Sequence, residues 1–240
     1  VDEARFEHLG QSQLVRLDLA TGHQTPLGKP GLYAGVDPSP DGKLILVTRI
    51  QRPFSYLVPV SQFPARDEVW DRHGALVHLA ADRPLAETIP IEGVRTGPRR
   101  LHWRPTEPAT LSWIEALDGG DPRKQVEHRD RLMSQAAPFK AAPSELLRAK
   151  ARLVGVEWSE RGDLAVVREH ERERRWNRTW LLDPAKPGAA RLAFDLNSND
   201  RYRDPGSFQH RTLPNGHGAL RVQDGKLWLS GAGATPQGDR

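Results

Sequence analysis

The sequence has 240 residues, and its 35 Lys and Arg against 31 Asp and Glu give a net charge of +4. A chain of this length can bury a substantial core as one all-β domain or as two small domains. Basic and acidic residues are interleaved and form no basic stripe, so the composition does not indicate a nucleic-acid-binding protein. The absence of cysteine excludes disulfides and thiolate chemistry. No apolar run approaches the length that a membrane-spanning helix needs.

The first predicted element in chain order is a hairpin over residues 13–28, with its turn at 20–23. Residues 35–47 then form the first copy of a phrase that the chain repeats. In this copy, Gly-Val and an acidic residue precede a Ser, a Gly and an apolar run. The same frame returns at 155–167, more loosely at 101–113 and faintly at 212–220.

The repeat predicts the architecture. Four positions are taken as equivalent between the copies: Pro38, Trp103, Trp158 and Thr212. The intervals between them are 65, 55 and 54 residues. Each copy is typical of a hairpin with a Gly at the turn position that needs positive φ. A unit of about 55 residues holds four short strands, which is the size of a propeller blade. A β-sandwich whose hairpins resemble one another by chance is the alternative.

Residues 49–71 form the least generic segment, with three prolines and four aromatic residues. Because proline cannot donate to a β-ladder, this segment is not expected to be a central strand. We expect a long connection that lies over a surface. Four aromatic side chains are predicted to hold it there: Phe54, Tyr56, Phe63 and Trp70.

The remaining elements follow from apolar runs and turn residues. A further hairpin is expected from 75–79 and 88–91, and a turn from 117–122. Residues 128–136 fit a strand or one or two helical turns, and residues 143–148 could begin a short helix. The charged run 168–178 is expected to form an exposed hairpin turn with cross-strand ion pairs. Strands are also expected at 179–182, 191–196 and 226–229.

The search for chemical motifs identifies no catalytic, cofactor-binding or metal-binding residue. No serine lies on a Gly-x-Ser-x-Gly elbow. His128-Arg129-Asp130 imitates a kinase catalytic loop, but the other kinase motifs are missing. The nine His have no ligand spacing, and the pair Asp118 and Asp121 is more typical of a turn than of a calcium site. Asn177-Arg178-Thr179 is a glycosylation sequon, which matters only in a eukaryotic secretory route.

Several longer phrases resemble a known family. They are Pro-Phe-Ser-Tyr-Leu-Val-Pro at 53–59, Phe-Pro at 63–64, Glu-Val-Trp-Asp at 68–71, Trp-Ile-Glu-Ala-Leu-Asp-Gly-Gly-Asp-Pro at 113–122, His-Arg-Asp-Arg at 128–131, Asp-Arg-Tyr-Arg-Asp-Pro-Gly at 200–206 and Ser-Gly-Ala-Gly-Ala at 230–234. From about residue 12 onwards, the chain resembles the N-terminal β-propeller of glutamyl endopeptidase-like members of the prolyl oligopeptidase family of serine peptidases.

The resemblance implies an all-β fold of about four blades with four antiparallel strands each, as part of a seven- or eight-bladed ring. Residues 1–240 would be an incomplete propeller, and the α/β-hydrolase domain with the Ser-Asp-His triad would not be present in this chain. No catalytic residue is carried over. The propeller of this family covers the active site and restricts access to peptides, and the branch cleaves chiefly after Glu.

Four arginines in the family-like phrases are possible contacts to an acidic substrate, with a structural role as the main alternative: Arg49, Arg52, Arg123 and Arg131. The expected partners are peptide substrates, through the missing catalytic domain, and not nucleic acid or a membrane. Self-association through uncovered terminal blades is also expected. No cofactor is implied, and a periplasmic or secreted bacterial location is favoured. A free-standing propeller that acts as a binding or scaffold module, without enzymatic activity, is the alternative function.

Overall fold

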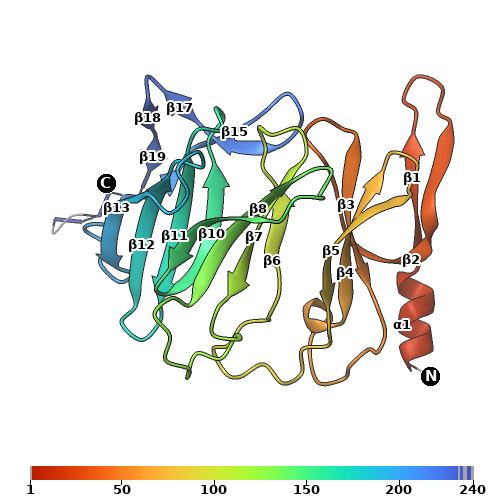
Figure 1. The fold of residues 1–240 in the computed structure, drawn as a ribbon, viewed down its shortest axis with the longest axis horizontal. Coiled ribbons are helices and arrows are strands. Elements are labelled where there is room, and N and C mark those ends of the chain that lie inside the picture. Colours follow the sequence, from red (N-terminus) through yellow and green to blue (C-terminus); the bar gives the residue numbers. More distant parts are fainter. Residues whose placement is uncertain (1, 232, 235–236, 239–240) are drawn as a thin grey trace.

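The structure, a computed structural model, describes residues 2–231, 233–234 and 237–238 and is almost entirely β (Figure 1). It begins with the helix α1 (Asp2–Gly10), and one 3-10 turn, η1 (Val60–Gln62), lies in a later connection. All pairs of named strands are antiparallel in the part of the chain that is described. No helix among these residues has the length and apolar character needed to cross a membrane.

The first sheet has five strands in chain order. They are β1 (Ser12–Leu17), β2 (Gln24–Pro38), β3 (Leu44–Ile50), β4 (Ala65–Asp71) and β5 (Leu76–Arg83). The long strand β2 serves two neighbours, because its first half pairs with β1 and its second half with β3. The hairpin predicted over residues 13–28 is therefore confirmed. The strands β2 to β5 form a four-stranded antiparallel unit, which is the kind of unit that the repeat predicts.

The second and third sheets have four strands each, again in chain order. The second contains β6 (Arg99–Trp103), β7 (Thr110–Ala116), β8 (Asp130–Ala136) and β9 (Ser144–Ala149). The third contains β10 (Arg152–Trp158), β11 (Ala165–Glu171), β12 (Trp176–Leu182) and β13 (Ala190–Asn197). Figure 1 shows the three sheets side by side from the N-terminal to the C-terminal end. Four-stranded antiparallel sheets are thus confirmed.

The last part of the chain forms three two-stranded sheets. Their strands are β14 (Ser207–Phe208), β15 (His210–Thr212), β16 (Gly218–Leu220), β17 (Val222–Gln223), β18 (Lys226–Leu227) and β19 (Leu229–Ser230). The described residues therefore contain no fourth four-stranded sheet and no closed ring. The expected strand at 226–229 is divided between β18 and β19, which have different partners.

The repeat has the predicted geometry. Trp103 is the last residue of the first strand of the second sheet, and Trp158 is the last residue of the first strand of the third sheet; both are buried. In the turn that follows Trp158, the Ser159 N–H donates to the Leu164 carbonyl at 2.8 Å, as the Ser39 N–H does to Leu44 in the first copy. The shared sequence frame therefore encodes one shared strand–turn–strand unit.

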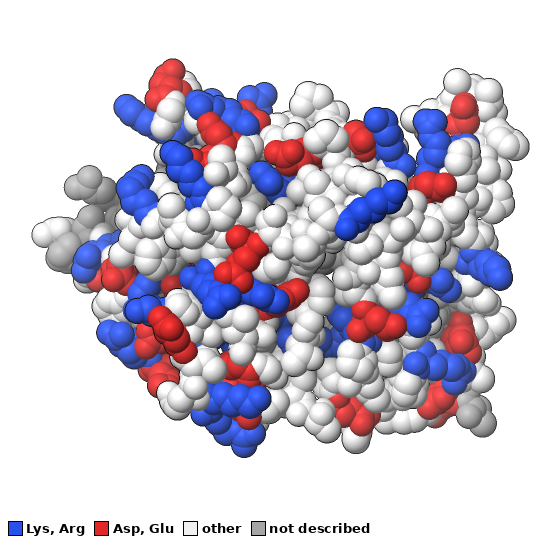
Figure 2. Space-filling model, in the orientation of Figure 1, with Lys and Arg blue, Asp and Glu red and all other residues white. Residues whose placement is uncertain are grey.

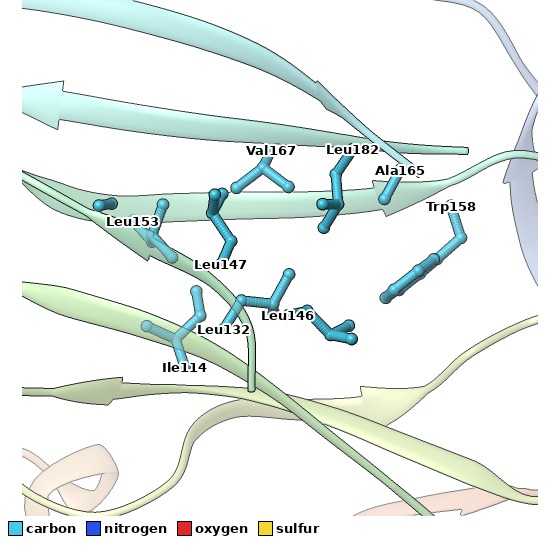
Figure 3. Close-up of a cluster of buried hydrophobic side chains, with 10 residues drawn as sticks. Ile114, Leu132, Leu146, Leu147, Leu153, Trp158, Ala165, Val167 and Leu182 are labelled. Carbon is cyan, nitrogen blue, oxygen red and sulfur yellow. The ribbon is translucent and has the colours of Figure 1, made fainter. Parts of the chain in front are cut away.

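The main hydrophobic core lies between the second and third sheets (Figure 3). Its buried side chains come from β7, β8 and β9 on one side and from β10, β11 and β12 on the other: Ile114, Leu132, Leu146, Leu147, Ala149, Leu153, Trp158, Ala165, Val167 and Leu182. A second cluster joins the first sheet to the second through Leu46, Val69, Trp103 and Leu111. Each sheet therefore buries apolar side chains against the next, and this burial drives their association.

The segment 49–71 corrects one prediction. Its last seven residues form β4, a central strand between β3 and β5. The three prolines of the segment all precede β4, so every residue of that strand keeps its N–H donor. Phe54, Phe63 and Trp70 are buried, as predicted for side chains that anchor this segment. Tyr56 is 73% exposed and does not anchor it.

Three further expectations change with the structure. Residues 88–91 form no strand, because β5 takes β4 as its partner. The open choice at 128–136 is decided as the strand β8, and the residues that could have begun a helix at 143–148 form the strand β9. The ladder between β8 and β9 satisfies backbone groups that a short isolated helix would leave at its ends.

The helix α1 was not predicted. Phe6 packs edge-on against Phe54 and Phe63, with ring centroids 4.9 and 5.9 Å apart. The Arg52 guanidinium binds the carboxylates of Glu3 at 3.0 Å and Glu7 at 2.6 Å. The connection after β3 therefore provides the surface on which the helix lies.

Candidate functional site

The first two arginines suggested by the sequence are engaged within the first sheet and its connections. Arg49 lies 3.5 Å from the buried Glu68 carboxylate and 5.9 Å from the centroid of the Tyr33 ring. Arg52 binds α1 and covers the Phe54 ring at 4.9 Å. Its hydrogen bond lowers the pKa of the Glu7 carboxyl. Both cations therefore have carboxylate partners from the chain itself.

The other two arginines are also paired. Arg123 forms two hydrogen bonds of 2.9 Å with Asp121, and these lower the pKa of that carboxyl to about 2. Arg131 binds Glu115 at 2.7 Å and lies 3.5 Å from Glu145. The structure does not bring the four arginines together into one site, because each belongs to a different local ion pair.

A network of ion pairs around two buried carboxylates connects the second sheet to the third. Asp130 is fully buried and accepts from Arg152 at 2.9 Å and from the Leu153 backbone N–H at 2.8 Å; Arg99 lies 2.7 Å away. Asp118 is 2% exposed and accepts from Arg129 at 3.0 Å and from Arg152 at 2.5 Å. Arg152 begins β10, so it joins both carboxylates of the second sheet to the third sheet.

This network explains the phrase that imitates a kinase loop. Arg129 of His128-Arg129-Asp130 binds the buried Asp118, and the buried Asp130 binds Arg152, so neither carboxylate of the network is free for chemistry. Sequence reasoning missed Asp118, Asp130 and Arg152 as a set. Their spacing of 12 and 22 residues along the chain gives no local signal of contact.

One pair of side chains imitates a nucleophile and its base. Ser112 Oγ lies 3.1 Å from His102 Nε2. Ser112 is fully buried, and the other ring nitrogen of His102 lies 2.7 Å from the Arg100 carbonyl instead of a carboxylate. A substrate cannot reach this serine, so the pair belongs to the packing between strands.

A cleft of about 1000 Å³ lies between the second and third sheets. Its walls include Leu147 and Lys150 on the side of β9, and Glu171 and Trp180 on β11 and β12. Arg172, in the turn after β11, binds Glu92 at 2.9 Å, and both residues lie at the edge of the cleft. The cleft therefore combines apolar side chains with many charged ones of both signs, whereas ligand sites are usually lined mainly by apolar groups.

Charge on the surface follows the expectation from composition. Figure 2 shows acidic and basic side chains mixed over the visible face. Residues 172–175 form the turn of the predicted hairpin, and Arg178 lies 3.3 Å from Glu171 across it. Within the described ranges, no group of three His, Asp or Glu side chains is placed to hold a metal ion. Asn177 of the sequon is exposed, and its side-chain carbonyl lies 2.7 Å from His170 Nδ1.

Comparison with known proteins shows that this chain is similar in sequence to plant glutamyl endopeptidases. No family model matches the sequence. A protein of Oryza sativa subsp. japonica named "Probable glutamyl endopeptidase, chloroplastic" is 39% identical over 248 aligned positions, which cover 99% of this chain and 26% of that protein. The resemblance to glutamyl endopeptidases is confirmed. An Arabidopsis thaliana protein of the same name is 37% identical and is covered to the same extent.

The chain spans about a quarter of the length of these glutamyl endopeptidase relatives. Both are plant proteins whose names include "chloroplastic", and neither supports the expectation of a bacterial exported protein. Among solved structures, the acylaminoacyl peptidase of Pyrococcus horikoshii is similar with a TM-score of 0.44 and 14% identity. That similarity covers 77% of this chain and 28% of the peptidase, and at this score we draw no conclusion from it.

Proposed function

We propose that this chain is the propeller portion of a serine endopeptidase of the prolyl oligopeptidase family that cleaves peptides after Glu. The observation that carries the proposal is the 39% identity to a probable glutamyl endopeptidase over almost the whole chain. The three successive antiparallel sheets are the arrangement that adjacent propeller blades require. The pairs at the end of the chain would then belong to a fourth blade of a larger ring.

In this proposal, the chain acts by covering the active site and admitting only peptides and flexible segments. The chain offers no accessible serine–histidine pair of its own in the described part, and each suggested arginine has a carboxylate partner. Catalysis would therefore come from a separate α/β-hydrolase domain. We propose no cell compartment, because the names of the plant relatives do not support bacterial export.

The test uses the complete natural protein that contains these residues. We expect it to hydrolyse a fluorogenic peptide with Glu before the scissile bond at least about tenfold faster than the matching Gln peptide, and to lose activity with a serine-reactive inhibitor. A folded protein with an exposed Glu should be cut far more slowly than its unfolded form. Equal cleavage of folded and unfolded substrate would contradict the covering role, and no cleavage of the Glu peptide would contradict the assigned activity.

A further inference from the structure

The turn that follows the first strand of each repeat lies at the same end of the sheets. These turns are residues 39–43, 104–109, 159–164 and 213–217. Residues 213–217, between β15 and β16, are called the fourth turn below. Figure 1 shows the fourth turn in blue at the upper edge, where it reaches from the third sheet towards the upper loops of the second and first sheets.

The first three turns contact one another in succession. The Asp41 N–H of the first turn donates to the Pro108 carbonyl of the second turn at 3.0 Å. Gly162 of the third turn approaches the second turn so closely that a Cβ there would lie 2.5 Å from Thr106 Oγ1. Such contacts are expected between successive blades of a propeller.

The fourth turn reaches two turns that are not next to it along the chain. Asn215 Nδ2 donates to the carbonyl of Pro105 in the second turn at 2.9 Å. His217 Nε2 lies 2.9 Å from the carbonyl of Pro38, 179 residues away, and must donate because a carbonyl can only accept. In a ring of about seven or eight blades, the first and fourth blades stand on nearly opposite sides of the axis. A turn of the fourth unit that binds the first unit therefore crosses the axial opening.

The fourth turn is held firmly at its base. Leu220 of β16 is fully buried, and its carbonyl accepts from the Glu160 N–H of the third turn at 3.0 Å. Within the turn, the Leu213 N–H donates to the His217 carbonyl at 2.8 Å, and the Gly216 N–H donates to the Leu213 carbonyl at 2.9 Å. A hairpin with a buried base and an internally bonded tip opens less readily than a loosely packed loop. These contacts favour a fixed closure over a lid that swings aside.

We infer that the fourth turn closes this end of the axial opening of the propeller, so that peptides reach the active site by another route. The inference rests on the proposed function in two respects, namely the ring of blades and the entry of peptides. Asn215 and His217 position the turn by binding the second and first units. Neither residue takes part in the chemistry.

The first experiment tests the position of the turn in the complete natural protein that contains these residues. Pro38→Cys is combined with His217→Cys, and a short bismaleimide is added; the 240 residues themselves contain no cysteine. We expect mass spectrometry to find the two positions linked. Leu57→Cys with His217→Cys is the matched control, because Leu57 is 81% exposed but follows β3, at the opposite end of that strand from the first turn. No link in the first pair, or equal linking of both pairs, would overturn the inference.

The second experiment tests the route of entry. The linked Pro38→Cys/His217→Cys protein should cleave the fluorogenic Glu peptide with a kcat/KM within about twofold of the same variant before linking, because no peptide has to pass the closed end. A larger loss on linking would overturn the inference, since the fourth turn would then have to move to admit the substrate.

The third experiment tests the contact that holds the turn. His217→Ala removes the donor to the Pro38 carbonyl, whereas His217→Gln keeps an N–H donor. Amide hydrogen exchange of residues 213–217 should become about two- to tenfold faster in the Ala variant, the effect of one hydrogen bond, and should change little in the Gln variant. Equal exchange in the His217→Ala protein and the unmodified protein would overturn the inference.

The two proposals fail separately. A complete protein that cleaves the Glu peptide but shows no link between positions 38 and 217 would leave the proposed function intact and overturn the closure. Conversely, a protein that is linked at these positions but cleaves no Glu peptide in either form would contradict the proposed peptidase, while the fourth turn would still cross the axis.

Discussion

The Trp158 indole donates a hydrogen bond to His102 Nε2 at 3.3 Å and so joins the third sheet to the second. Ser112 Oγ lies 3.1 Å from the same nitrogen, and His102 Nδ1 lies 2.7 Å from the Arg100 carbonyl. This arrangement requires a proton on Nδ1 and none on Nε2, which is neutral histidine. Trp103 makes the corresponding contact one sheet earlier, because its indole donates to the Asp37 carbonyl at 2.9 Å.

The neutral state of His102 predicts a pH dependence of stability. Burial lowers the pKa of His102, so protonation is less favourable in the folded protein than in the unfolded chain. The free energy of unfolding should therefore fall as pH drops below about 6.5, the ordinary histidine value. Urea unfolding at pH 8 and pH 5 measures this effect.

The variant His102→Gln should show a smaller loss of stability between these two pH values. His78, whose pKa is also lowered by burial, accounts for part of the dependence that remains. His23→Gln serves as the control, because His23 is exposed. An unchanged pH dependence in the His102→Gln protein would show that this residue is not the buried neutral group.

Removal of one carboxylate from the buried network should be costly. Asp130→Ala removes the carboxylate that Arg99 binds, one of the two carboxylates that Arg152 binds, and the acceptor of the Leu153 N–H. We expect the free energy of unfolding to fall by about 3–5 kcal/mol. Asp121→Ala is the control, because it breaks the pair with the exposed Arg123 side chain and one hydrogen bond from the Arg123 backbone N–H, and it should change stability much less. Similar losses in both variants, measured by urea unfolding, would contradict this account.

The core between the second and third sheets predicts a second large effect. Leu153 is 1% exposed and packs in this cluster, so Leu153→Ala should lower the free energy of unfolding by about 2–5 kcal/mol. Leu192→Ala removes the same atoms from a residue that is 39% exposed, and its effect should be much smaller. Thermal melting of the two variants at one pH measures the difference. Equal shifts in Tm would mean that the sheets do not pack as described.

Two glycines of the repeat should differ in their tolerance of alanine. Gly42 and Gly162 both have positive φ, at 68° and 74°, so either substitution adds backbone strain of about 1–2 kcal/mol. A Cβ at Gly162 would also lie 2.5 Å from Thr106 Oγ1, whereas a Cβ at Gly42 meets no atom. Gly162→Ala should therefore destabilise the protein more than Gly42→Ala in urea unfolding. The reverse order would contradict the close approach of Thr106 to the third-sheet turn.

The sequence predicted the repeated unit because a turn glycine and the apolar runs beside it lie within a few residues of one another. A Gly at positive φ between two apolar runs specifies a tight hairpin wherever it stands, and the structure has such turns at Gly42 and Gly162. The equivalence of Trp103 and Trp158 follows from the same frame. Where a signal was shared between helix and strand, as at 128–136, the chain alone left the choice open, and at 143–148 it suggested only that a short helix could begin there. Pairing with a neighbouring strand made both segments β.

The sequence by itself determined an all-β chain of antiparallel sheets and its relationship to glutamyl endopeptidases. Only the tertiary structure decided which charged residues meet. Arg152 is 34 residues from Asp118 and 22 from Asp130, yet it binds both, because β10 begins beside the start of β8 and the turn that follows β7. Ion pairs depend on distance in space, and sheet stacking sets that distance with no trace in the local sequence. The same stacking left Lys150 beside an open cleft and paired the four arginines that the sequence had suggested.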